Sequence, residues 1–162
     1  MRELAERFVD QFEETYGYPP DDHEVIAVSP GDEAEVRRRL EDANVSGDLV
    51  DLYSQLETVS LPDLENGYFI HSADELLEGM RGGQPNRVVG AVEDSITVFG
   101  SDGGGGLFAL NAAQDKVYRL SGGALVGAVY EVDPPGLEIV SDGLSGYLGF
   151  LEAELTQAVQ GG

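Results

Sequence analysis

Two histidines are the residues of this sequence whose type and surroundings suggest chemistry, and the first lies in a run of acids. His23 belongs to the segment Asp21–Glu24, DDHE, in which every side chain is of a type that binds metal ions. Adjacent residues of an extended segment point to opposite sides, so few of these four side chains could reach one ion. No His-x-x-x-His pair accompanies them. We therefore expect a solvated acidic linker at this position, and no metal site.

The second histidine, His71, follows the apolar segment Tyr68–Ile70 and precedes Ser72. A general base needs a nucleophile or an orienting carboxylate within reach, and in sequence only Asp74 is close. The chain has no cysteine, and no serine lies in the Gly-x-Ser-x-Gly pattern of a nucleophile elbow. We therefore expect a polar histidine at the end of a strand. The sequence predicts neither catalytic residues nor an enzyme.

A run of four glycines interrupts the segment Val98–Asn111, VFGSDGGGGLFALN, which predicts a strand, a six-residue connection and a second strand. A phosphate-binding loop requires a Lys-Ser or Lys-Thr pair after its glycines and then a helix, whereas the apolar segment Leu107–Leu110 follows here. We therefore expect a hairpin that presents a surface and holds no cofactor. At least one of Gly103–Gly106 should have a positive φ. Asp102→Ala should cost less folding free energy than a valine at that glycine.

Negative charge dominates the composition. The 162 residues carry 31 Asp and Glu against 9 Lys and Arg, which gives a formal net charge of −22. Residues 1–80 hold 21 of these acids and 5 arginines, so most of the excess lies in the first half. Such a surface repels nucleic acid phosphates and attracts basic proteins. The alternative is that the acidity serves solubility or adaptation to a salty cytosol.

The length favours one domain over residues 1–162, and no apolar run approaches the roughly 20 residues of a membrane helix. Residues 1–12 mix charges among their apolar positions, so we expect no leader peptide, no membrane contact and a cytoplasmic location.

Apolar spacing predicts helices first, then short strands, then one closing helix. This order is typical of an α+β domain with N-terminal helices, a largely antiparallel sheet of about six strands and a closing C-terminal helix. Residues 21–28 should be a linker. The helices are expected at 2–16, from Ser29, from Ser46 (through Leu56), from Ser72 and at about 144–159, where Leu148, Leu151 and Leu155 should pack on the sheet. The segments with strand character are 59–61, 68–71, 87–92, 96–99, 107–110, 117–120, 124–132 and 137–140.

The glycine-rich hairpin also resembles the central signature of the SUKH superfamily, which includes cell-wall-assembly regulators and bacterial immunity proteins. Three further segments are similar, in the same order, to the early helix, the following strand and the closing segment of these domains. The four segments are 46–61 (SGDLVDLYSQLETVSL), 65–70 (ENGYFI), 100–106 (GSDGGGG) and 146–155. The resemblance covers about residues 46–155 and leaves 1–45 as an N-terminal helical extension.

This resemblance implies a non-enzymatic intracellular protein-binding module, and among the family's roles we expect an immunity protein that neutralises a basic, nuclease-type toxin. Two alternatives stay open: a regulatory or scaffold protein of the same fold, and a small-ligand-binding protein that uses the hairpin. The residues expected to contact the partner lie on and beside the hairpin: Asp94, Phe99, Ser101, Asp102, Gly103, Gly104 and Gly105.

Overall fold

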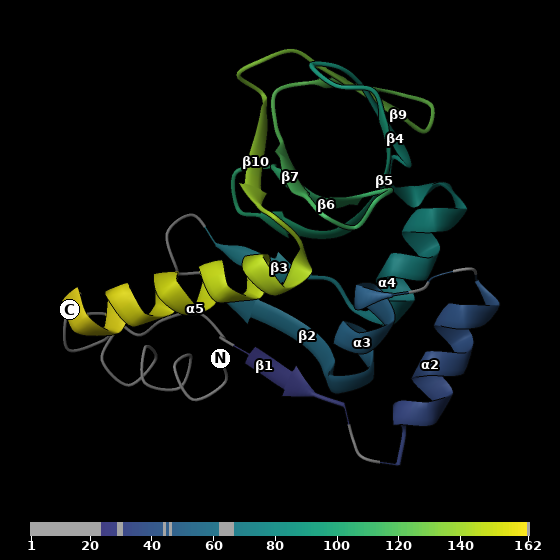
Figure 1. The fold of residues 1–162 in the computed structure, drawn as a ribbon, viewed down its shortest axis with the longest axis vertical. Helices are drawn as coiled ribbons and strands as arrows, with labels where there is room; N and C mark the ends of the chain where they lie inside the picture. The colour runs from purple at the N-terminus through teal and green to yellow at the C-terminus, as the bar shows by residue number, and fades with distance from the viewer. Residues whose placement is uncertain (1–23, 29–30, 44, 46, 62–66, 162) are drawn as a thin grey trace.

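The computed structural model describes residues 24–28, 31–43, 45, 47–61 and 67–161. These residues form an α+β domain with helices towards both ends, as the sequence predicts (Figure 1). The helical elements are α2 (Glu33–Asp42), α3 (Asp48–Gln55), α4 (Ala73–Glu78), the π-helical turn η1 (Gly79–Gly83) and α5 (Leu144–Gly161). The helix expected at 2–16 and the residues Asp21 and His23 lie outside the described part of the chain.

The described residues form ten strands, more than the sequence pattern suggested. Glu24–Ala27, expected to be part of a linker, is a strand. The segment 124–132, expected to be one strand, is divided by a turn at Gly127, whose φ is +63°. The strands are β1 (Glu24–Ala27), β2 (Leu56–Leu61), β3 (Tyr68–Ile70), β4 (Arg87–Gly90), β5 (Asp94–Asp102), β6 (Leu107–Asn111), β7 (Val117–Leu120), β8 (Ala124–Val126), β9 (Val129–Val132) and β10 (Leu137–Ser141).

The strands belong to one sheet that branches at β5. One arm runs β1-β2-β3-β5, and β5 then pairs with both β4 and β6. The order continues β6-β7-β10 on one side and β4-β9-β8 on the other. Every described pair is antiparallel except β4 with β9, which confirms the expected antiparallel character. In Figure 1 the strands β4, β5, β6, β7 and β10 curve around a common centre above the helices.

Two hydrophobic cores lie on opposite faces of this curved sheet. Strand β6 contributes to both, because its side chains alternate between the faces. Phe108 and Leu110 belong to the core shared with the helices, whereas Ala109 belongs to the core enclosed by the curved strands. The helical core also contains Tyr53 and Tyr147. The branching strands are therefore held from both sides.

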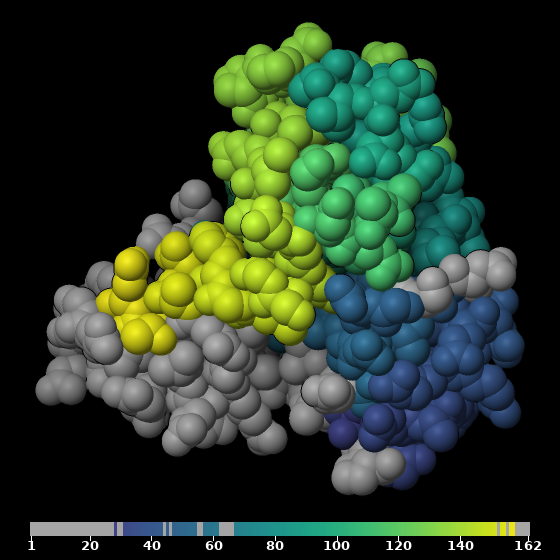
Figure 2. Space-filling model, in the orientation of Figure 1, coloured from purple at the N-terminus to yellow at the C-terminus, as the bar shows by residue number. Residues whose placement is uncertain are grey.

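The closing helix α5 packs on the sheet as expected. Leu151 and Tyr147 are fully buried, and the Tyr147 ring lies 5.0 Å from the ring of Phe108, centroid to centroid. Leu148 is half-buried at the edge of this core. Leu155 belongs to α5, but its side chain is outside the described part of the structure. Figure 2 shows β10 and the start of α5 side by side on the face towards the viewer.

Ser72 begins α4 in the way its sequence predicts. Its Oγ accepts a hydrogen bond from the Glu75 N–H at 3.2 Å, which caps the helix, and donates one to Glu75 Oε1 at 3.3 Å. The expected caps Ser29 and Ser46 lie outside the described residues. The helix expected from Ser29 starts later than predicted, because α2 begins at Glu33 with Asp32 as its N-cap. Leu56 was expected to belong to the helix that is now α3. It is instead the first residue of β2.

Candidate functional site

The glycine-rich connection between β5 and β6 is folded around its own aspartate. Strand β5 continues through Asp102, so the connection is only Gly103–Gly106, shorter than the six residues expected. All four glycine N–H groups donate within the chain. The bonds are Gly103 N–H to the Gly67 carbonyl (3.2 Å), Gly104 N–H to Asp102 Oδ1 (2.9 Å), Gly105 N–H to the Asp102 carbonyl (3.4 Å) and Gly106 N–H to Asp102 Oδ1 (2.8 Å). The loop therefore has no N–H group left to bind a phosphate.

Two of the four glycines are required by this geometry. Gly105 has a φ of +87°, which confirms that one glycine of the run has a positive φ. A Cβ at Gly106 would lie 2.6 Å from Asp102 Oδ2, so the carboxylate leaves no room for a side chain there. Gly104 is different, because its Cβ would meet Asp102 Oδ1 at an ordinary 3.5 Å.

Asp102 also forms an ion pair with Arg119 of β7. Its Oδ2 accepts a hydrogen bond from Arg119 Nε at 2.8 Å and lies 2.7 Å from Arg119 Nη2. The Asp102 side chain is only 6% exposed, and that of Arg119 is 30% exposed. Burial opposes ionisation of the carboxyl, but the hydrogen bonds from Gly106, Arg119 and Gly104 outweigh it, so the pKa of Asp102 is lowered. From this geometry we expect Asp102→Ala to carry a substantial cost of its own, because the substitution removes the acceptor at the centre of the loop and leaves the Arg119 cation unpaired.

A cavity of about 450 Å³ lies beside this ion pair. It lies between strands β3, β6, β7 and β10 and helix α5, and we call it the Arg119 pocket. Tyr68 and Phe150 meet edge to face with their ring centroids 5.8 Å apart. Glu138, which stands opposite Arg119 in the β10–β7 pair, and Glu154 of α5 add two carboxylates. The lining residues are Gly67, Tyr68, Asp102, Phe108, Arg119, Glu138, Val140, Phe150 and Glu154.

Arg119 is a residue of the candidate site that the sequence pattern did not predict. It is a lone cation between Tyr118 and Leu120 in a strand whose other residues are all buried. A charge in such a strand needs a partner of opposite sign, because an unpaired charge is costly to bury. That pattern could have indicated a carboxylate nearby, although it does not identify Asp102.

The residues expected to contact a partner do not form one surface. Asp94 and Asp102 are the first and last residues of the nine-residue strand β5, so they lie at its opposite ends. The Asp94 carboxylate accepts a hydrogen bond from the Tyr118 hydroxyl at 3.1 Å. Phe99 is fully buried against Tyr147 in the helical core, so its side chain is not on the surface. The exposed members of the set are Gly103, Gly104 and Gly105.

Ser101 pairs with His71, which the sequence did not predict. Ser101 Oγ and His71 Nε2 are 3.1 Å apart, and both side chains are half-buried. Burial lowers the pKa of His71, and the charge of Glu75 opposes that effect only in part. No carboxylate of the described residues is hydrogen-bonded to the ring. The pair thus lacks the third group that orients the base in a hydrolytic triad.

A second concave site, the α2–α4 groove, has a volume of about 250 Å³ and an acidic lining. Arg39 and Asp74 form an ion pair across it. Asp32, Glu35 and Glu57 also line it and have no ion pair among the described residues. Asp32 stands at the N-cap of α2, yet its side chain makes no capping hydrogen bond. The groove therefore has an excess of negative charge.

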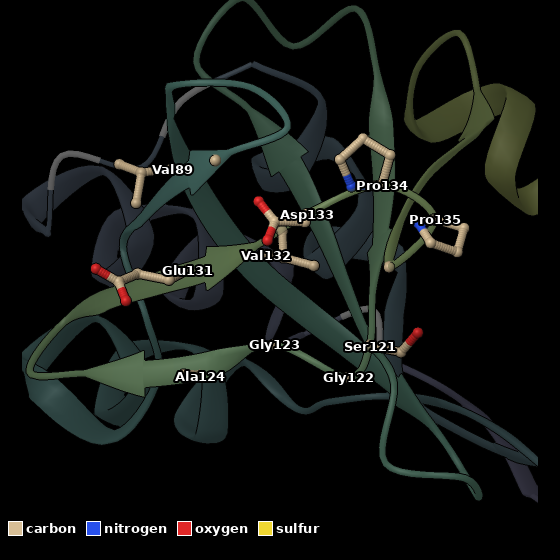
Figure 3. A pocket seen from close by; sticks show the side chains of 12 residues that line it. Val89, Ser121, Gly122, Gly123, Ala124, Glu131, Val132, Asp133, Pro134 and Pro135 are labelled. Carbon is tan, nitrogen blue, oxygen red and sulfur yellow. The ribbon is translucent and has the colours of Figure 1, made fainter.

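A third cavity, of about 900 Å³, lies where the turns after β4, β7 and β9 meet (Figure 3). Four of its twelve lining residues are glycines. A Cβ at Gly90 would lie 2.2 Å from the Val132 carbonyl oxygen, and one at Gly136 would lie 2.4 Å from that of Ser121. These glycines are therefore explained by close approach of the turns. In Figure 3 the carboxylates of Glu131 and Asp133 do not converge on one point.

Comparisons with protein-family models, with curated proteins and with solved structures found no match to this chain. Within the described residues, no group of three or more His, Asp or Glu side chains is arranged to hold a metal ion. No helix among them is long and apolar enough to cross a membrane.

Proposed function

We propose that this chain is a non-enzymatic protein-binding module whose partner is a basic protein. The observation that carries the proposal is uncompensated negative charge. The net charge is −22, and several of the few arginines are already neutralised within the fold. Those in described ion pairs are Arg37, Arg39, Arg87 and Arg119. Three carboxylates of the α2–α4 groove, those of Asp32, Glu35 and Glu57, have no ion pair among the described residues.

A surface with this charge changes how the protein meets other molecules. It raises the encounter rate with basic proteins and suppresses association with acidic ones and with nucleic acids. The glycine-rich loop adds no competing anion site, because its N–H groups are already bonded to Gly67 and Asp102. Binding of a basic protein is thus the function that the charge distribution favours.

Within that class, we propose an immunity protein that neutralises a basic, nuclease-type toxin in the same cell. The order of the four segments similar to SUKH domains supports this role. The chemistry supports it independently, since a nuclease must present cations to phosphate and an acidic protein can cover them. The alternative is a regulatory or scaffold protein of the same fold. Such a protein would also attract a basic partner, but that partner would not be toxic to the cell.

Co-expression separates these two roles. Each gene adjacent to that of this chain is expressed alone and together with the full-length chain, and growth is recorded. The immunity role predicts that one neighbour arrests growth and that co-expression of this chain restores it. Absence of any toxic neighbour, or toxicity that this chain does not relieve, would contradict immunity and favour the regulatory role.

Capture from extract tests the broader claim. The tagged chain, held at low salt in extract of its source cells, should retain a protein of basic composition and release it as salt rises. An unrelated protein of equal net charge and size is the control bait. If both baits retain the same proteins, the capture reflects charge alone and the proposed specific partner is contradicted.

A further inference from the structure

We propose that the Arg119 pocket receives a cationic side chain, an arginine or lysine of the basic partner, between its aromatic rings and the carboxylates of Glu138 and Glu154. This inference rests on the proposed function and names the group of the partner that is anchored. The charge balance of the pocket and the nature of its walls support this anchor.

The charge balance favours a cation although an arginine lines the pocket. Arg119 and Asp102 neutralise each other in an ion pair, with a hydrogen bond from Nε to Oδ2 at 2.8 Å and Nη2 2.7 Å from Oδ2. Nη1 of Arg119 lies 3.4 Å from Ser121 Oγ. The two carboxylates that remain, Glu138 and Glu154, have no ion pair among the described residues and leave the pocket negative. An anion entering the pocket would meet both of them.

The aromatic walls suit a cation with an apolar stem. Tyr68 and Phe150 are half-buried, so part of each ring remains uncovered, and their edge-to-face contact turns the two ring planes 89° from each other. Ring faces attract guanidinium and ammonium groups, and Arg also stacks flat on them. Val140 adds apolar surface for the methylene groups of the stem. The volume of about 450 Å³ lies within the usual range of binding sites for small groups.

The Tyr147 ring supports two walls of the pocket from behind. Its ring centroid lies 5.0 Å from that of Phe108 and 6.2 Å from that of Phe150, and both of these rings line the pocket. Tyr147 itself is fully buried and does not line the pocket. The aromatic walls are therefore packed against the core and are in place before a ligand binds.

The test titrates the ¹⁵N-labelled full chain with Nα-acetyl-arginine amide and Nα-acetyl-lysine amide, and with uncharged Nα-acetyl-citrulline amide for comparison. We expect saturable shifts of the Gly67, Tyr68 and Phe150 resonances with the two cations and not with citrulline. Glu138→Gln/Glu154→Gln should weaken binding about tenfold. Phe150→Leu should also weaken it without loss of the folded spectrum.

The matched control is Glu41→Gln/Asp42→Asn, which removes the same two charges from exposed residues at the end of α2. It should change the affinity less than about twofold. Equal loss in both double variants would overturn the pocket as the anchor. So would shifts at these resonances with inorganic phosphate or acetate, or no shift there with either cation. Those results leave salt-dependent capture of a basic partner standing, so failure of the pocket is distinguishable from failure of the proposed function.

Discussion

At the level of single residues, Asp102 joins the glycine-rich loop to strand β7 through one carboxylate. Asp102→Ala removes two loop hydrogen bonds and leaves Arg119 without its partner. We expect a loss of about 3 kcal/mol in the free energy of unfolding, measured by urea denaturation. Asp94→Ala is the control, since it removes one hydrogen bond from Tyr118 and should cost about 1 kcal/mol. A smaller loss for Asp102→Ala than for Asp94→Ala would contradict this role.

The lowered pKa of Asp102 makes its contribution depend on pH. Because the folded state holds the charged form, the stabilisation is fully present above the ordinary Asp pKa of about 3.9 and is lost as pH falls through the lower folded value. The stability gap between the parent chain and Asp102→Asn should therefore narrow below about pH 4. Urea denaturation from neutral to acid pH measures it. A gap that stays constant over this range would show that Asp102 is not held as a carboxylate.

Gly105 tests the conformation of the same loop. Its φ of +87° lies in a region that a β-branched residue avoids, so Gly105→Val should lower the free energy of unfolding by more than about 1 kcal/mol. Gly104→Val is the matched control, because Gly104 has no positive φ and a Cβ there meets only an ordinary contact. Equal losses from the two substitutions would argue that bulk, and not backbone strain, decides the effect.

The sequence predicts local features of the chain, but it does not predict the ion pair between Arg119 and Asp102. Ser72 caps α4 and Gly105 has a positive φ, because both depend on residues within a few positions of themselves. Arg119 and Asp102 lie 17 residues apart and meet only through the order of β5, β6 and β7. Nothing in the local pattern of Asp102 distinguishes an exposed turn aspartate from one that its own loop encloses.

At the level of elements, α5 carries the helical core against the sheet. Leu151 is fully buried in this helix, so Leu151→Ala should cost about 2–5 kcal/mol of unfolding free energy. Leu148 is only half-buried at the edge of the same core, and Leu148→Ala should cost clearly less. Thermal or urea unfolding of both variants decides the matter. Similar losses at the two positions would contradict this packing of α5.

The spacing of apolar residues does not predict all strand boundaries or strand pairings in residues 87–141. Residues 124–132 read as one apolar run, but Gly127 turns the chain and makes β8 and β9 a hairpin. The parallel pairing of β9 with β4 joins residues about 40 positions apart, so no hairpin spacing reveals it. Strand β5 pairs with three neighbours along its nine residues, and pairing on this scale depends on the whole sheet.

At the scale of the whole molecule, the net charge of −22 has two possible roles, and experiments can distinguish them. If acidity serves only solubility or adaptation to salt, any carboxylate is equivalent and no surface matters more than another. If it serves recognition, carboxylates near the partner should matter more than those elsewhere. The Arg119 pocket and the end of α2 provide the paired variants for that comparison.

The central claim is that negative charge drives association with a basic partner, and the association rate constant against ionic strength tests it most directly. The full-length chain and the partner captured from extract are mixed in a stopped-flow instrument at about 10 mM and about 150 mM salt, between which the Debye length falls from about 30 Å to about 8 Å. We predict that association slows several-fold over this range while dissociation changes little. An association rate that does not change with salt would contradict the account.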